Sequence, residues 1–148
     1  EDLDQERDSL ETLSFRFPHP DDDGCHDNLD DDNKRNKNKP ICIELEGYSM
    51  DSGKVWSSTG LTIWRASGVL CDYILKNHMD WKKRKRILEL GAGLGLCGIL
   101  IHRTTPASTY VCLTDGDTDT LKQLRTNIQR NYLPNNDNND NDDVDVDF

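Results

Sequence analysis

The residues whose types and spacing suggest chemistry gather in ILELGAGLGLCG (87–98) and at one aspartate beyond it. Glycine at positions 91, 93 and 95 permits a positive φ and lets a ligand lie against bare backbone. Gly98 follows one turn later, where a missing side chain allows close packing of a helix on a strand. Asp115 comes 24 residues after Gly91, which suits a carboxylate that accepts hydrogen bonds from two ribose hydroxyls. The pattern predicts a site for a cofactor that contains a nucleoside.

Glu89, two residues before the first of these glycines, indicates which cofactor the loop holds. NAD and S-adenosylmethionine both contain adenosine, so Asp115 suits either. A pyrophosphate is bound by backbone N–H groups and is repelled by a nearby anion. S-adenosylmethionine has no phosphate and carries a cationic sulfonium and a cationic ammonium. The acid therefore favours S-adenosylmethionine, with a surface charge or an ion pair to the basic run 81–86 as the alternative interpretations of Glu89.

Two segments near the start of the chain have the pattern of half-buried strands. Apolar and polar residues alternate in TLSFRF (12–17) and in ICIELEG (41–47). We expect these two strands to form a hairpin, with Ile41, Ile43 and Leu45 on one face.

Helices and strands alternate in the rest of the chain. Apolar residues at helical spacing predict a helix over 61–76, with Thr59 as its N-cap. The segments that follow are predicted as a strand at RILEL, a helix that ends at Pro106, a strand over 108–115 and an amphipathic helix with Leu121, Leu124 and Ile128 in register. Strands that alternate with helices imply a parallel sheet with helices on its faces. The expected fold class is Rossmann-like α/β.

Three motifs resemble those of one enzyme family. ILELGAGLGLCG is similar to motif I of the class I, seven-strand, S-adenosylmethionine-dependent methyltransferases, and LTDGD (113–117) resembles the acidic motif that follows it. In the segment 59–74, Gly60, Trp64 and Ala66 resemble the pattern of the protein-lysine methyltransferases that modify elongation factors, calmodulin and chaperones. The spacing L-x-x-L-x-x-N-x-x-x-N over 121–131 matches the same family. The resemblance covers about 41–131 and, more weakly, 12–17.

The resemblance implies a class I methyltransferase fold, S-adenosylmethionine as cofactor and a protein lysine side chain as substrate. It also implies the cofactor-binding residues: Trp64 near the cofactor, Glu89, Gly91, Gly93 and Gly95 around its methionine end, Asp115 at its ribose and Gly116 near its adenine. For Trp64 the competing interpretation is an ordinary core aromatic on an amphipathic helix.

The predicted domain is incomplete. We expect 41–133 to be the N-terminal half of the cofactor-binding domain, so that its first parallel strand has no neighbour on one side. The family carries an Asp-x-x-Tyr motif after its fourth strand, and this sequence has none. The catalytic residues are therefore expected beyond residue 148, and the chain by itself is expected to be inactive.

The two ends of the chain are acidic. Residues 1–40 hold thirteen Asp and Glu against six Lys and Arg, and 134–148 hold six against none, whereas 41–133 hold nine against twelve. Such segments bury too little apolar surface to offset chain entropy. We expect 1–40 to be largely disordered apart from the strand at 12–17, and 134–148 to be a low-complexity tail or a truncated insertion.

The composition also limits partners and location. The five cysteines are odd in number and form no C-x-x-C pair, which predicts a reducing compartment and no metal site. No apolar run approaches the roughly 20 residues that span a bilayer. The basic run 81–86 is interpreted as a solvated helix end, with a nuclear import signal or a nucleic-acid contact as the alternative, so nucleic acid is not the expected partner. We expect a monomer when complete, in the cytoplasm, with the nucleus as a second location.

Two other functions are compatible with parts of the pattern. The chain could be a degenerate, non-catalytic protein that binds a partner through the 61–76 helix and its acidic ends. It could also be half of a nicotinamide oxidoreductase, which Glu89 disfavours.

Overall fold

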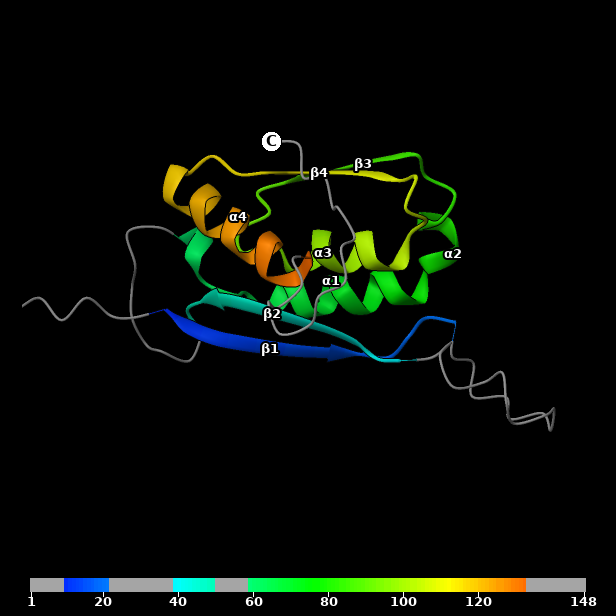
Figure 1. The fold of residues 1–148 in the computed structure, drawn as a ribbon, viewed down its shortest axis with the longest axis horizontal. Coiled ribbons are helices and arrows are strands. Elements are labelled where there is room, and N and C mark those ends of the chain that lie inside the picture. The colour runs from blue at the N-terminus through cyan, green and yellow to red at the C-terminus, as the bar shows by residue number, and fades with distance from the viewer. Residues whose placement is uncertain (1–9, 22–38, 50–58, 133–148) are drawn as a thin grey trace, which may run out of the picture.

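The computed structural model describes residues 10–21, 39–49 and 59–132. Figure 1 shows three layers, with a hairpin on one side, a pair of parallel strands on the other and helices between them. The segments predicted to be disordered, most of 1–40 and all of 134–148, lie outside the described residues. The elements are β1 (Glu11–Phe17), β2 (Ile41–Gly47), the 3-10 turn η2 (Thr59–Leu61), α1 (Arg65–Lys76), α2 (His78–Trp81), β3 (Arg86–Leu90), α3 (Leu96–Thr104), β4 (Tyr110–Thr114) and α4 (Thr118–Tyr132).

Strands β1 and β2 form the predicted antiparallel hairpin, with Phe15 opposite Ile43. On β2 every second side chain is buried: Ile41, Ile43 and Leu45 face the helices, and Glu44 between them is exposed. Each buried aliphatic side chain contributes about 1.5–3 kcal/mol of transfer free energy. The alternation read from the sequence is therefore confirmed.

Helix α1 begins later than predicted, at Arg65. The segment before it is extended because its backbone pairs with the end of the hairpin. Tyr48 N donates to the carbonyl of Leu61 at 2.8 Å, and Ile63 N donates to the carbonyl of Tyr48 at 3.0 Å. Groups committed to these bonds cannot make helical ones, so the prediction of Thr59 as N-cap is wrong. Thr59 instead opens the turn η2.

Helix α1 carries apolar residues on two faces, and the core covers one of them. Cys71 and Ile74 are fully buried against the core, whereas Leu70 and Tyr73 are 44% and 56% exposed. The spacing indicated a helix correctly but could not show which of two apolar faces meets the rest of the chain. No described residue covers the face that carries Leu70 and Tyr73.

Helix α3 is buried on nearly all sides, since it lies between β2 and β4 (Figure 1). Every residue of Leu96–Ile101 is buried. A helix that is apolar all round belongs inside a protein. At Gly98, an added Cβ would lie 2.1 Å from Cδ2 of Leu113 on β4, so the predicted close packing at this glycine is confirmed.

Strands β3 and β4 are parallel, with Leu88 opposite Cys112, and α3 connects them. This unit is the strand–glycine loop–helix–strand order that the sequence predicts, and the fold is partial Rossmann-like α/β. Within the described ranges β3 pairs with β4 alone. Leu88 and Leu90 point away from the helices and are 60% and 76% exposed.

Candidate cofactor site

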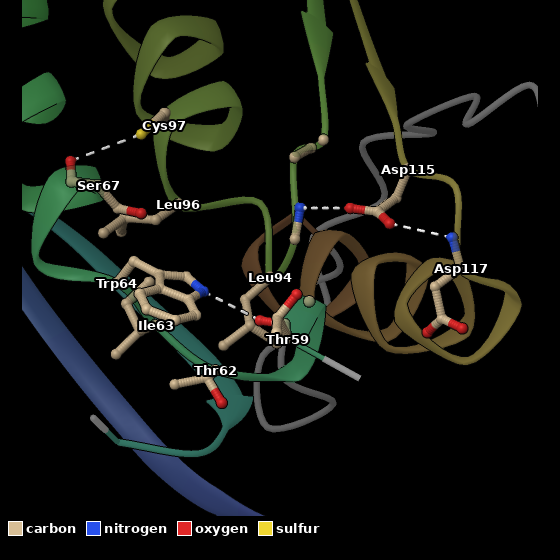
Figure 2. Close-up of a pocket in the computed structure, with 14 residues that line it drawn as sticks. Thr59, Thr62, Ile63, Trp64, Ser67, Leu94, Leu96, Cys97, Asp115 and Asp117 are labelled. Atoms are coloured by element: carbon tan, nitrogen blue, oxygen red, sulfur yellow. Dashed lines mark hydrogen bonds between the residues drawn. The ribbon is translucent and has the colours of Figure 1, made fainter. Parts of the chain in front are cut away.

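A cavity of about 440 Å³ opens where β3 ends and α3 begins. Parallel α/β sheets bind their ligands at this end of the strands. Figure 2 shows side chains from three segments around the cavity: the stretch that leads into α1, the glycine loop with the start of α3, and the loop after β4. The lining residues are Thr59, Gly60, Thr62, Ile63, Trp64, Ser67, Gly91, Ala92, Gly93, Leu94, Leu96, Cys97, Asp115 and Asp117.

Three glycines set the path of the loop between β3 and α3. Their φ angles are 65° at Gly91, 55° at Gly93 and 91° at Gly95, all in the left-handed region that side chains disfavour. The loop is tied to the neighbouring strand, since Ala92 N donates to the carbonyl of Thr114 at 2.8 Å. The predicted need for glycine at these three positions is confirmed.

The carboxylate of Asp115 binds two backbone amides (Figure 2). Its Oδ2 accepts from Gly93 N at 3.0 Å, and its Oδ1 accepts from Asp117 N at 3.1 Å. Each carboxylate oxygen keeps a second lone pair, so Asp115 can also accept from a ligand hydroxyl. Asp115 therefore joins the glycine loop to the start of α4 as well as lining the cavity.

Asp117 is the N-cap of α4 and lines the same cavity. Its Oδ2 accepts from the backbone N of Thr120 at 2.9 Å and from the hydroxyl of Thr120 at 2.8 Å. A side-chain oxygen that binds the amide three residues on is the usual way in which a helix start is capped. A second acid thus stands beside Asp115.

Trp64 forms part of the cavity wall and is half exposed. Its Nε1 donates to the carbonyl of Thr59 at 3.0 Å, as Figure 2 shows. The interpretation of Trp64 as an ordinary core aromatic is therefore wrong. The indole presents a flat apolar surface beside the cavity.

Gly60 lets this wall approach both the glycine loop and α4. A Cβ at Gly60 would lie 2.2 Å from Oγ1 of Thr120, and a Cβ at Gly93 would lie 3.2 Å from the carbonyl oxygen of Gly60. Thr120 is fully buried. Because Gly60 and Gly93 have no side chain, the segment before α1, the glycine loop and the start of α4 pack closely against one another.

Glu89 is half-buried, with its Oε2 buried against α3, and it is not among the residues that line the cavity. Its Oε2 has no hydrogen-bond partner and would lie 2.7 Å from a Cβ at Gly98. Burial raises the pKa of Glu89 to about 7, and the backbone amide of Gly98 acts in the opposite direction. The surface-charge interpretation is wrong, and no ion pair joins Glu89 to the described residues of 81–86.

The structure brings four of the seven predicted cofactor-binding residues to one cavity: Trp64, Gly91, Gly93 and Asp115. Of the other three, Glu89 lies against α3, Gly95 forms the N-cap of α3, and Gly116 lies in the turn between two lining aspartates. The binding roles of all seven residues stay predictions.

Several lining residues were not predicted. Asp117 had a signal, because an aspartate three residues before Thr120 is a typical N-cap. Thr59, Thr62 and Ser67 had no such signal, since only the tertiary fold brings these residues to the cavity.

No cluster of three potential metal ligands occurs in the described part of the chain. Of the helices that the structure describes, none has the length and apolar character needed to cross a membrane.

The fold defines a partial domain of the Rossmann-like α/β class, with a cavity where β3 ends and α3 begins. Comparison with known proteins shows the family: residues 50–145 match the family model described as lysine methyltransferase. The chain belongs to this family.

Individual relatives agree with this assignment. An uncharacterised protein of Dictyostelium discoideum is 35% identical over 84% of this chain and 34% of its own length. The calmodulin-lysine N-methyltransferase of Arabidopsis thaliana is 32% identical over 62% of this chain and 30% of its own length. The EEF1A lysine methyltransferase 3 of Xenopus tropicalis is 36% identical over 50% of this chain and 31% of its own length. The chain thus spans about a third of the length of these relatives.

Proposed function

We propose that the protein binds S-adenosylmethionine in this cavity and methylates lysine side chains of another protein. The observation that carries the cofactor proposal is the charge of the cavity. Two aspartates line it, Asp115 and Asp117, and none of the described lining residues is Lys, Arg or His. A cofactor with cationic groups and no phosphate suits such a lining better than a pyrophosphate does.

The glycine loop supports the same choice. A pyrophosphate binds free backbone N–H groups at a helix start. In this loop Gly93 N already donates to Asp115 and Ala92 N donates to the carbonyl of Thr114. The buried Oε2 of Glu89, behind the loop and without a partner, adds an acid that attracts cations.

Different residues of this chain would contact different parts of the cofactor. Asp115 would accept from the ribose hydroxyls, the loop from Gly91 to Gly95 would leave room for the methionine end, and Trp64 would cover one side. The cofactor supplies an electrophilic methyl group when bound. The acceptor lysine must lose its proton before its nitrogen can attack, which a site achieves by excluding water or by accepting that proton.

The cofactor is tested by thermal protection of the full-length protein. We expect S-adenosylhomocysteine at 100 times its Kd to stabilise the fold by about 2.7 kcal/mol, and NAD to have no effect. Protection by NAD alone would overturn the cofactor assignment in favour of an oxidoreductase.

The acceptor is tested separately. The full-length protein is given S-adenosylmethionine with a labelled methyl group and a peptide array in which each lysine is paired with an alanine or arginine control. Label on lysine peptides alone supports the proposal. Label only on RNA or small molecules would reject protein lysine as the substrate.

We also propose a reducing compartment, the cytoplasm with the nucleus as a second location. The described cysteines Cys42, Cys71, Cys97 and Cys112 are all free thiols. Imaging of the tagged full-length protein tests this, and secretion would contradict it.

A further inference from the structure

The outer edge of β2 is bound by side chains where a sheet would have another strand. Alternate residues of β2 point their backbone groups away from β1. Asn131 Oδ1 accepts from Glu44 N at 3.1 Å and Asn131 Nδ2 donates to the Glu44 carbonyl at 2.7 Å. Asn127 repeats this pattern at Glu46, with an N···O distance of 2.8 Å to the amide and 3.2 Å to the carbonyl. Both asparagines come from α4.

A third side chain completes this edge. Arg103 at the end of α3 donates through Nη1 to the carbonyl of Cys42 at 3.0 Å and through Nη2 to the backbone carbonyl of Asn131. An unpaired strand edge invites pairing with other chains. Here the helices satisfy it, which fixes how far α4 can slide along the hairpin.

Asn127 makes one bond that Asn131 does not. Its Nδ2 donates its second hydrogen to the carbonyl of Leu94 in the glycine loop, at 3.1 Å. Asn127 is fully buried, and both of its amide hydrogens are used. One side chain thus connects the hairpin, α4 and the loop that lines the cavity.

The side chain of Leu94 reinforces the link. Leu94 is 2% exposed, and a Cβ at Gly47, the last residue of β2, would lie 2.2 Å from its Cδ1. The hairpin therefore packs on the side chain of Leu94 while Asn127 binds its carbonyl. The loop position depends on both.

We propose that Asn127 is a positioning residue for the cofactor: by binding Glu46 and Leu94 together it holds the glycine loop in the shape that the cofactor requires. This inference rests on the proposed function of the cavity. Asn131 provides a matched control, because it makes the same two bonds to β2 and no bond to the loop.

The test compares Asn127→Ala and Asn131→Ala in the full-length protein. The first readout needs no ligand: amide hydrogen exchange at Ala92, Gly93 and Gly95, whose N–H groups are all bonded within or beside the loop. We expect exchange to accelerate about tenfold in Asn127→Ala and less than twofold in Asn131→Ala, because only the first loses a bond to the loop.

The second readout is the Kd for S-adenosylhomocysteine, measured well below the melting temperature so that a loss of global stability alone does not change it. We expect Asn127→Ala to raise the Kd about two- to tenfold, the range that one net hydrogen bond supplies. Asn131→Ala should raise it less than twofold. If Asn127→Ala does not fold, Asn127→Ser replaces it, since its hydroxyl keeps one donor at this position.

Equal loop exchange in the two variants would overturn the inference and leave Asn127 as a hairpin contact only. Failure of the wild type to bind S-adenosylhomocysteine would instead overturn the proposed function. Loop exchange would still decide whether Asn127 holds the loop.

Discussion

Replacing Glu89 by glutamine tests two separate effects of its carboxyl group. One is the free energy that burial of the ionised carboxyl costs the fold, and the other is the attraction for a cationic cofactor that we propose. In the ligand-free protein, burial raises the pKa of Glu89 from 4.5 to about 7. The folded protein thus holds this proton more tightly than the unfolded chain does. The shifted pKa of Glu89 therefore contributes to the free energy of unfolding fully below pH 4.5. This contribution is lost as the pH rises towards 7, and above that the free energy of unfolding no longer changes through Glu89.

The size of the effect follows from the shift. A difference of about 2.5 pKa units corresponds to about 3 kcal/mol, which residual access to solvent reduces to about 2 kcal/mol. Glutamine has the same shape and no charge. We therefore expect Glu89→Gln to be more stable than the wild type by about 2 kcal/mol at pH 8 and by less than about 1 kcal/mol at pH 5.

Urea unfolding of the ligand-free, full-length protein at the two pH values measures this difference. Glu44→Gln is the control for loss of one charge, because the Glu44 side chain is exposed on β2. The reasoning is refuted if Glu89→Gln is no more stable than the wild type at pH 8, or if it gains equally at both pH values.

The same variant tests the attraction of Glu89 for a cation. A cationic ligand favours the ionised carboxyl, so the affinity of the wild type for S-adenosylmethionine should increase between pH 5 and 7, by up to about tenfold per pH unit. In Glu89→Gln the affinity should be weaker at pH 8 and nearly independent of pH over this range. Calorimetric titration at four pH values measures both, and a steep pH dependence that survives the substitution would exclude Glu89 as its source.

Four further substitutions have expected outcomes, three from the packing at glycines and one from the hydrogen bonding of Asp115. Gly60→Ala should weaken S-adenosylhomocysteine binding at least tenfold by calorimetry, because its Cβ would lie 2.2 Å from Thr120 Oγ1; unchanged affinity would contradict the proposed wall. Gly98→Ala should destabilise the fold by about 1–3 kcal/mol in urea, whereas Gly68→Ala, with nothing within 4 Å, should stabilise it by about 0.5–1 kcal/mol. Asp115→Asn should raise the Kd for S-adenosylhomocysteine at least tenfold in the same titration, and an unchanged Kd would remove Asp115 from the ribose site.

The parts of the fold that could be predicted depend on local rules. Alternation revealed both hairpin strands, and three glycines revealed the left-handed loop, because each position is constrained by its own backbone. The start of α1 could not be predicted, since it depends on a tertiary contact. The backbone of Tyr48, just after β2, bonds to the backbone of Leu61 and Ile63, just before α1.

The candidate site likewise has features that follow from local rules and features that depend on tertiary contacts. Gly91 and Asp115 could be placed from the strand ends that precede them. The orientation of Glu89 could not, because a carboxylate at the end of a strand looks the same in sequence whether it meets the cavity or the helix behind it. Only the close approach of Gly98 shows which of these occurs.

The four-residue spacing of Asn127 and Asn131 limits the length of the β2 edge that a single helix can bind in place of a neighbouring strand. Four helical residues advance about 6.0 Å, and two strand residues advance about 6.7 Å. Asn127 and Asn131 can therefore both meet alternate residues of β2 with an error of about 0.7 Å, within the tolerance of a hydrogen bond. The mismatch between the two advances grows with each further step along the edge. At the next position, the carbonyl of Cys42 accepts from Arg103, which belongs to a different helix.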